Sequence, residues 1–152
     1  MSMRDGSGPG KLEAIWIKPA RGAPMDPVPQ ARLIANHGLD GNANVGGKRQ
    51  VTLLEREVWE RIMKEMSAGL DPAARRANLL VSRFPLAGTR NRILRVGKCR
   101  IRIRGETSPC HQMDAALPGL RQALDENWHG GAYGVVLDDG TISLGDDLTW
   151  EI

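Results

Sequence analysis

Short apolar segments separated by turn residues make up most of the chain. Segments of this length, bounded by glycine, proline, asparagine or aspartate, are typical of β-strands. The turn signal Asp138-Asp139-Gly140 also predicts a hairpin between the two segments that flank it. The predicted strands are residues 12–18, 79–81, 92–96, 98–104, 132–137, 141–144 and 148–152.

Two of these segments show which faces should be buried. Successive side chains of a strand point to opposite faces. In the segment 98–104 we therefore expect the apolar side chains to face inward and the charged ones outward. These are Ile101 and Ile103, alternating with Arg100, Arg102 and Arg104. In the segment 12–18 we expect one face to carry Leu12, Ala14 and Trp16.

One longer segment follows a helical period instead. Apolar residues recur at four-residue spacing from Leu54 to Met66, as expected for an amphipathic helix. Thr52 and Glu55 match a capping box, in which the threonine caps the first free amides and the glutamate reaches back. The sequence therefore predicts a helix that starts at Thr52.

Two further helices are expected, and together the elements define a fold class. Asp71-Pro72 predicts a short helix that ends near Arg76, and residues 117–128 predict a modest one. Seven or eight short strands with two or three helices favour a mainly β (α+β) fold. We expect a closed or half-closed antiparallel β-barrel with two or three flanking helices.

Composition indicates one domain and a broad cellular class. The 152 residues suffice for a single core, which we place at residues 11–152 after a flexible N-terminal tail at 1–10. The chain has no apolar run of the roughly 20 residues that cross a bilayer, and no secretory signal. Its two cysteines do not make a disulfide framework. We therefore expect a cytoplasmic protein that has no membrane partner.

Charge is distributed unevenly along the chain. Residues 75–105 hold ten Lys and Arg and no acidic residue, so this block carries +10. Residues 106–152 hold nine acidic residues and one Arg, so they carry −8. Two explanations remain open: the acidic third folds against the basic block, or an anionic ligand binds to the block. Arginine suits phosphate-bearing ligands because its guanidinium is planar and bidentate.

Cys110 is the first candidate for chemistry. It follows Pro109 in a loop after a strand, beside His111 and behind an arginine-rich segment, and such surroundings favour the reactive thiolate. The alternative is that Cys110 is a small buried apolar residue. Cys99 lies inside an alternating strand, and we interpret it as a packing residue.

Two polar clusters are candidate anion sites. Arg76 and Asn78, two residues apart, can share one face of extended chain and offer several donors to one anion. Lys48 and Arg49 follow two glycines just before the predicted capped helix, whose N-terminus would favour anions. The sequence has no Walker A, GxGxxG or GxSxG motif, and its three histidines lack metal-ligand spacing.

In order along the chain, these motifs resemble the MOSC domain family, named for the C-terminal domain of molybdenum cofactor sulfurases. The resemblance covers roughly residues 12–152, and the ordered set of motifs carries it rather than any single one. The motifs are GLDG at 38–41, GGKRQVTLLERE at 46–57, ARRANLLV at 74–81, VGKCRIRI at 96–103, Pro109-Cys110, and GGAYGVVLDDGTISLGDDLTW at 130–150.

The resemblance implies a barrel-like fold and a set of site residues. The family cysteine holds sulfur as a persulfide or ligates molybdenum, and that role would fall on Cys110. The Arg-x-Asn pattern contacts the pterin and its phosphate, which points to Arg76 and Asn78. Looser candidates for cofactor binding are Lys48, Arg49 and Ser108. The family is also associated with pyridoxal phosphate through a fused desulfurase-like domain, and we do not expect that cofactor here.

One departure from the family pattern affects the expected activity. Many stand-alone members read Gly-Asp-x-His where this chain has Gly41-Asn42-Ala43-Asn44. Amides cannot act as general acids or bases near neutral pH. The resemblance therefore favours a protein that binds molybdenum cofactor (molybdopterin), or carries sulfur for it, and that meets a sulfur donor or acceptor protein.

Two other functions stay open at this point. One is a molybdenum-dependent reductase of N-hydroxylated compounds, which would take electrons from a separate partner. The other is nucleic-acid binding through the basic segment 83–104, which the calculated isoelectric point of about 9.2 permits. Aromatic residues make up only 4% of the chain, so a base-stacking platform is poorly supplied, and nucleic acid is not an expected partner.

Overall fold

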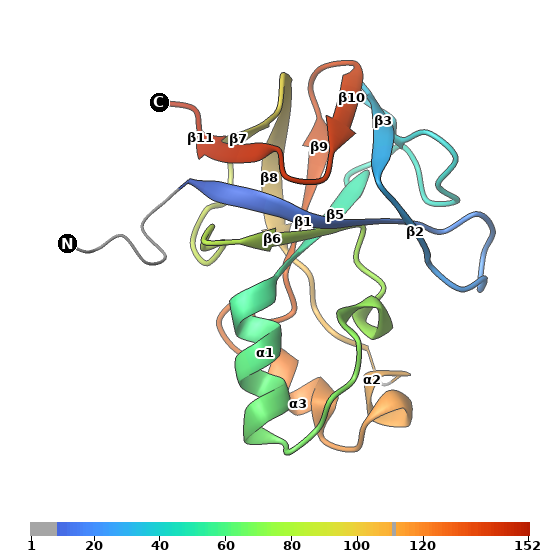
Figure 1. Cartoon of the computed structure of the whole chain (residues 1–152), viewed down its shortest axis with the longest axis vertical. Helices are drawn as coiled ribbons and strands as arrows, with labels where there is room; N and C mark the ends of the chain where they lie inside the picture. Colours follow the sequence, from blue (N-terminus) through green and yellow to red (C-terminus); the bar gives the residue numbers. More distant parts are fainter. Residues whose placement is uncertain (1–8, 111) are drawn as a thin grey trace.

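Seven strands close into a β-barrel in this computed structural model, which describes residues 9–110 and 112–152 (Figure 1). Hydrogen bonds run in the order β11-β7-β8-β9-β5-β6-β1, and β1 pairs back with β11 to complete the ring. The barrel expectation is therefore confirmed, in its closed form. Its strands are β1 (Gly10–Ile17), β5 (Val51–Glu55), β6 (Leu79–Ser82), β7 (Ile93–Val96), β8 (Cys99–Glu106), β9 (Ala132–Val136) and β11 (Asp147–Trp150).

One pair of barrel strands is parallel, which the antiparallel expectation did not include. β5 and β6 run side by side in the same direction, with Leu53 opposite Leu79. Parallel neighbours need a crossover connection, and here α1 (Arg56–Glu65) and the 3₁₀ helix η1 (Pro72–Arg75) supply it. This crossover brings η1 and the residues after it to the edge of the barrel.

The remaining elements lie outside the ring. β2 (Asp26–Val28) adds an edge strand to β1, and a second sheet has the order β10-β3-β4. The helices gather on one side of the barrel, below it in Figure 1. Their bounds, with those of the second sheet, are β3 (Gln30–Ile34), β4 (Gly38–Leu39), β10 (Gly140–Ser143), α2 (Gln112–Ala116) and α3 (Leu120–Leu124).

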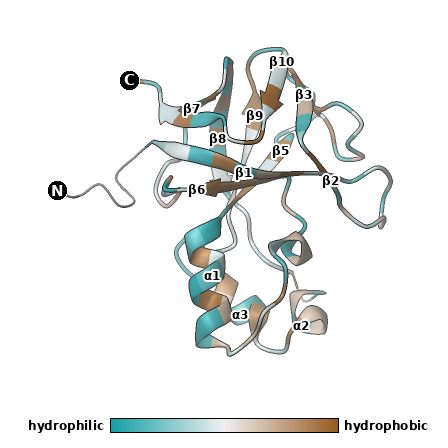
Figure 2. Cartoon of the chain, viewed as in Figure 1, coloured by the Kyte–Doolittle hydropathy of each residue, from teal (hydrophilic) through white to brown (hydrophobic). Residues whose placement is uncertain are grey.

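Two apolar clusters hold these layers together. The barrel interior includes Ile101 and Ile103, both fully buried, while Arg104 is exposed, as the alternation predicts. A second cluster joins the helices to the outer face of the barrel and includes Trp59 and Leu80. β6 contributes to both clusters and is brown along its length in Figure 2. None of the described helices is long and apolar enough to cross a membrane.

Several local predictions were wrong for a common reason, which is the pairing of strands that are far apart in the sequence. β1 has an irregularity between Leu12 and Ala14, so Leu12 and Trp16 join different clusters rather than one face. The predicted helix start at Thr52 is strand β5, and helix α1 begins at Arg56 without a side-chain cap. Strand pairing of Thr52 with Tyr133 replaces the capping box.

Other corrections concern the second half of the chain and its start. Strands β9 and β10 form no hairpin with each other, since β9 pairs with β5 and β8 while β10 pairs with β3. The helix expected at 117–128 is confined to α3, and α2 precedes it. Of the predicted tail at 1–10, residues 1–8 lie outside the described residues, and Gly10 belongs to β1.

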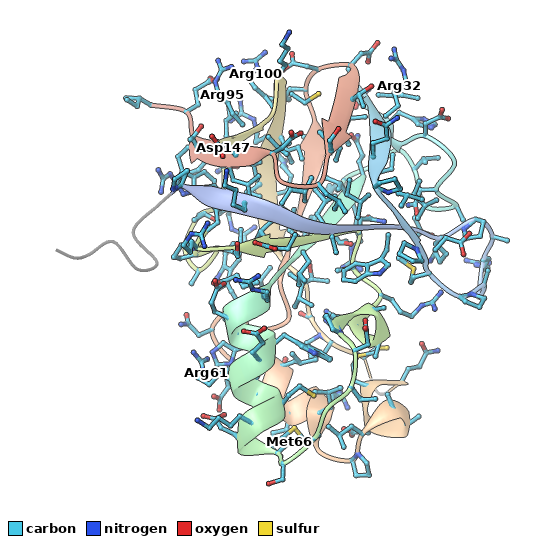
Figure 3. The ribbon with its side chains drawn as sticks, in the orientation of Figure 1. Arg32, Arg61, Met66, Arg95, Arg100 and Asp147 are labelled. Atoms are coloured by element: carbon cyan, nitrogen blue, oxygen red, sulfur yellow. The ribbon has the colours of Figure 1, made fainter. Side chains whose placement is uncertain are left out.

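The acidic last third neutralises part of the basic block. Arg95 pairs with Glu151 at 2.9 Å, and Arg100 pairs with Asp138 at 2.9 Å. Figure 3 shows Arg95 and Arg100 together at the end of the molecule away from the helices. The arginines at the start of the block, Arg75 and Arg76, lie elsewhere, at the cavity described below. The first explanation of the charge pattern thus accounts for only part of the block.

Candidate functional site

A cavity of about 180 Å³ lies where the barrel meets the helical side. It collects side chains from segments that are far apart in the sequence. They come from the segment between β1 and β2, from β5 and the loop before it, from the end of η1 and the residues after it, from the loop after β8, from α2, and from the segment before β9. The lining residues are Lys18, Met25, Asn42, Asn44, Arg49, Gln50, Thr52, Leu53, Arg75, Arg76, Ala77, Asn78, Thr107, Cys110, Gln112, Met113 and Gly130.

Cys110 contributes a thiol to the lining of this cavity. The side chain is exposed, and its thiol is free. The backbone carbonyl of Cys110 accepts a hydrogen bond from Met113 at 3.0 Å, which ties the loop to the first turn of α2. Its exposure disagrees with the alternative of a small buried apolar residue. His111, its predicted neighbour, lies outside the described residues.

Cys99, by contrast, is a packing residue, as the sequence predicts. It is fully buried in the barrel interior. Burial raises the pKa of the Cys99 thiol, and the carboxylates of Asp138 and Asp146 raise it further. The two cysteines therefore differ sharply in access to solvent, and only Cys110 can meet a ligand.

Four cationic side chains line the cavity, and none of the described residues that line it carries a carboxylate. The four cations are Lys18, Arg49, Arg75 and Arg76. Within residues 9–110 and 112–152, none of the four makes an ion pair with Asp or Glu. Burial lowers the pKa of Lys18, and the positive charges of Arg76 and Arg21 lower it further. The cavity is therefore electropositive and suited to an anion.

Arg75 is a functional candidate that the sequence reasoning missed. It is only 8% exposed, and its guanidinium donates to the carbonyl of Gly130 at 3.0 Å and to that of Thr107 at 3.3 Å. It thereby links the loop that carries Cys110 to the segment entering β9. Burial lowers the pKa of Arg75, and the charge at Cys110 opposes that effect. Adjacent arginines give no sequence signal that separates the buried one from its neighbour.

Arg76 and Asn78 both line the cavity, but not as an extended face. Arg76 has a left-handed backbone conformation with φ of 65°, because it ends η1, so the chain turns there. Its guanidinium donates to the carbonyl of Ala23 at 2.7 Å. The predicted pair is therefore brought together by the turn rather than by strand periodicity.

The side chain of Asn78 makes its hydrogen bonds with other residues of the protein. Its oxygen accepts from the amide of Thr52 at 3.1 Å and from the Thr52 hydroxyl at 3.2 Å. Its amide group donates to the carbonyl of Trp16 at 3.2 Å and to Oδ1 of Asn42 at 3.3 Å. Asn78 thus joins β1, β5 and the loop before β5, which makes it a positioning residue at the cavity wall.

Asn42, one of the two amides that depart from the family pattern, is similarly engaged. Its side-chain oxygen accepts from the backbone amide of Lys18 at 2.8 Å, and its nitrogen donates to the carbonyl of Asn44 at 2.9 Å. Asn42 is buried, whereas Asn44 is exposed, and both line the cavity. The Asn42 side chain thus holds the loop after β4 against the residue that follows β1.

The structure brings only some of the looser candidates for cofactor binding to the cavity. Arg49 lines the cavity, and its guanidinium lies 5.2 Å from the centre of the Tyr133 ring. Lys48 lines an adjoining open depression of about 570 Å³, which shares Arg49 and Asn44 with the cavity. Ser108 is exposed and does not line the cavity.

One buried polar atom at this site lacks a protein partner. Thr107 lines the cavity and is 8% exposed, yet its hydroxyl makes no hydrogen bond within the part of the chain that is described. Buried polar groups are nearly always paired, so this hydroxyl has hydrogen-bonding capacity that the described part of the protein does not use. Close by, a Cβ added at Gly130 would come within 2.4 Å of the Thr107 carbonyl. The wall of the cavity therefore requires glycine there.

Comparison with known families identifies the family of this chain. A family model described as the MOSC domain matches residues 37–149 of this chain. The chain belongs to the MOSC domain family. The matched range contains Cys110, Arg49, Arg75 and Arg76, whereas Lys18 lies before it. A comparison with curated proteins finds no match.

Solved structures share the same fold. YuaD from Bacillus subtilis has a TM-score of 0.75 at 17% identity, over 93% of this chain and 94% of that one. YiiM from Geobacillus stearothermophilus has a TM-score of 0.77 at 17% identity, over 95% of this chain and 76% of that one. YiiM from Escherichia coli has a TM-score of 0.70 at 19% identity, over 93% and 70%. At these identities the likeness concerns the fold alone.

The residues of the cavity fit the cofactor with which the MOSC domain family is associated. A cysteine thiolate is a soft ligand suited to sulfur-rich metal centres. Arginine and lysine side chains suit a phosphate group, and the Thr107 hydroxyl is a free hydrogen-bonding group. The cavity alone is small for a pterin, since whole-ligand pockets measure about 300–1,000 Å³. The adjoining depression next to Arg49 extends the space available.

Proposed function

We propose that this chain binds molybdenum cofactor, or carries sulfur destined for it, through Cys110. The single observation that carries this proposal is the exposed cysteine at the wall of a cavity with four cations and no carboxylate. When bound, the cofactor would supply a redox-active metal and a phosphate group. Cys110 would be a metal ligand or would hold a sulfur atom as a persulfide.

The other side chains would hold and orient the ligand. Arg49 and Arg76 both line the cavity and would bind phosphate oxygens. Arg75 would stabilise negative charge near Cys110 while its carbonyl contacts fix the loop position. Lys48 would contact the part of the ligand that extends into the depression. Asn78 would act indirectly, by holding β1 and β5 in place.

The amides at 42 and 44 favour binding over acid–base catalysis. Both line the cavity at the positions where many stand-alone members of the family carry Asp and His. An amide neither donates nor accepts a proton in a catalytic step near neutral pH. We therefore place a binding or carrier role ahead of reductase activity for this chain.

Expression in a host that makes molybdenum cofactor tests this proposal. Wild type and Cys110→Ala would be purified and assayed for molybdenum by elemental analysis and for released pterin by fluorescence. We expect both in wild type and a large loss of molybdenum in Cys110→Ala. Cys99→Ala is the matched control and should retain both, because Cys99 is buried away from the cavity.

Two results would contradict the proposal. One is a wild-type protein that holds neither molybdenum nor pterin and acquires no sulfur at Cys110. The other is a folded Cys110→Ala variant that retains as much molybdenum as wild type. Circular dichroism of each variant would show that the barrel is intact, so that loss of ligand is not loss of fold.

A further inference from the structure

The cavity, taken without the adjoining depression, suits a compact ligand. On the same measure of volume, one water molecule needs about 10–15 Å³, so a cavity of about 180 Å³ has room for a small polyatomic ion and some water. It is below the size of typical pockets for whole organic ligands, which is about 300–1,000 Å³. A small ion could therefore occupy it without the rest of a cofactor.

The charge of the lining indicates that this ion is an anion, and its polar groups indicate an oxyanion. Four cations face the cavity and no carboxylate does, so a single negative charge would leave it positive. Arginine donors match the oxygens of tetrahedral anions well. The unpaired Thr107 hydroxyl, on a side chain nine-tenths buried, is a further group with hydrogen-bonding capacity to spare. This observation is independent of Cys110.

We propose that the cavity accepts a small dianion that carries a transferable sulfur atom, with thiosulfate as its simplest example, and that Cys110 takes that sulfur. This inference rests on the proposed function, because it identifies a source of sulfur for the carrier role of Cys110. It follows from the coincidence in one small space of an exposed thiol, four cations and an unpaired hydroxyl.

The transfer is balanced without any further reactant. The Cys110 thiol loses its proton to solvent, and the thiolate attacks the outer sulfur of thiosulfate. A new sulfur–sulfur bond forms at Cys110 while the sulfur–sulfur bond of thiosulfate breaks. The electron pair of the broken bond leaves with sulfite, and the product is a persulfide at Cys110. Arg75 and Arg76 would stabilise the sulfite dianion as it departs.

Mass spectrometry of the intact chain tests this step. The reduced protein, freed of reductant, would be incubated with sodium thiosulfate, and sulfite release would be measured in parallel. We expect each chain to gain one sulfur atom and to release one sulfite. Cys110→Ser should gain none, and Cys99→Ala should behave as wild type because its side chain is enclosed in the barrel core.

A second reagent separates anion recognition from simple thiol reactivity. Dimethyl trisulfide is neutral and also reacts with thiolates, which take up a methylthio group as a mixed disulfide and release methyl persulfide. Arg49→Gln and Arg76→Gln should slow loading by thiosulfate about tenfold or more, since a charge-assisted contact is worth about 1.5–3 kcal/mol. The reaction with the trisulfide should change little. Sodium chloride should slow only the thiosulfate reaction, because salt screens the attraction between cations and dianion.

Specific outcomes would overturn the inference. It fails if wild type forms the mixed disulfide with the trisulfide but gains no sulfur from thiosulfate, or if both arginine variants react with thiosulfate at the wild-type rate. If wild type does not react with thiosulfate yet still purifies with molybdenum and pterin, thiosulfate is refuted as the source of sulfur, but the proposed function is not. A Cys110→Ser variant that keeps its full molybdenum content would refute the proposed function instead.

Discussion

Asn78 illustrates, at the scale of single residues, how a side chain can shape a binding site through protein contacts alone. Removing it takes away the partner of the Thr52 amide and of the Trp16 carbonyl, while the Thr52 hydroxyl still accepts from the backbone amide of residue 78. Each buried group left unpaired costs about 1–3 kcal/mol. We expect Asn78→Ala to lower the free energy of unfolding by about 3 kcal/mol, measured by urea denaturation.

Arg76→Ala is the control for that experiment. Its guanidinium makes a single contact with Ala23, so its loss should cost about 1 kcal/mol or less. An Asn78→Ala variant as stable as wild type that nevertheless lost its ligand would show that Asn78 binds the ligand directly.

Glu55 gives a stability prediction that depends on pH. Burial raises its pKa above the ordinary value of 4.5, the nearby Glu57 carboxylate raises it further, and a hydrogen bond from the Leu86 amide opposes this. The folded state therefore holds this proton more tightly than the unfolded state does. Protonated Glu55 makes its full contribution to the free energy of unfolding below pH 4.5, and this contribution is lost as pH rises through the folded-state pKa.

Glu55→Gln should remove the loss of stability that accompanies rising pH. We expect the variant to be more stable than wild type at pH 7 and about equally stable at pH 4, as followed by thermal unfolding at both values. Glu60→Gln, whose side chain is 67% exposed, should show no such difference. Equal pH profiles for wild type and Glu55→Gln would contradict the assignment.

Sequence reasoning at the residue scale found some of the site and missed some. Cys110 stood out because a cysteine after proline in a loop is seldom packed in a core. Arg49 stood out because it follows two glycines just before a predicted helix, and Arg76 because it could share a face of extended chain with Asn78. Lys18 and Thr107 gave no such signal. Their positions at the cavity depend on how distant segments meet, which no local pattern records.

At the scale of elements, the approach of β9 to β5 is controlled by a glycine. Gly131 has a φ of +103°, and a Cβ there would lie 2.0 Å from the carbonyl oxygen of Leu53, a backbone atom that cannot move aside easily. We expect Gly131→Ala to destabilise the fold by more than about 3 kcal/mol, because strain and steric overlap add. Chemical denaturation would measure the loss.

Gly46→Ala provides the matched comparison. Gly46 also has a positive φ, of +73°, but a Cβ there meets nothing within 4 Å. Only the backbone strain remains, so Gly46→Ala should lower the free energy of unfolding by about 1–2 kcal/mol. Similar losses for the two variants would mean that the close contact at Leu53 is relieved by a shift of β9.

The elements themselves were predictable where local and tertiary preferences agree. The strands near 79–81, 92–96 and 98–104 were placed well because apolar runs, alternation and turn residues all indicate the same structure. The segment 51–55 was misread because Thr52 and Glu55 satisfy a helix-start pattern locally. Pairing of β5 on both edges, with β6 and β9, outweighs that preference.

At the scale of the whole molecule, charge divides into two regions with different partners. Arg95 and Arg100 are paired with the acidic C-terminal third at one end, while the cavity cations have no acidic partner in the described chain. An anion in the cavity should therefore stabilise the fold. At a phosphate concentration ten times Kd the gain is about 1.4 kcal/mol, or about 3–6 °C in Tm for a domain of this size.

Differential scanning calorimetry would check this expectation. Sodium chloride at the same ionic strength should produce a smaller rise, and Arg49→Gln combined with Arg76→Gln should reduce the effect of phosphate to that of chloride. An unchanged rise in the double variant would place the anion outside the cavity.

The fold as a whole was more predictable than its connections. Counting strands and helices pointed to a closed or half-closed barrel, because short half-buried strands need a closed sheet to pair all their edges. The parallel β5–β6 pair and the separation of β9 from β10 were not predictable, since both depend on which strands become neighbours in space.

The ratio of molybdenum to pterin in three purified proteins tests the central claim most directly. If Cys110 holds the metal and the cations hold the phosphate, Cys110→Ser should lose molybdenum and retain part of its pterin. Arg49→Gln combined with Arg76→Gln should lose both together, while wild type holds equal amounts. A Cys110→Ser protein with the wild-type ratio and the wild-type content would contradict the account.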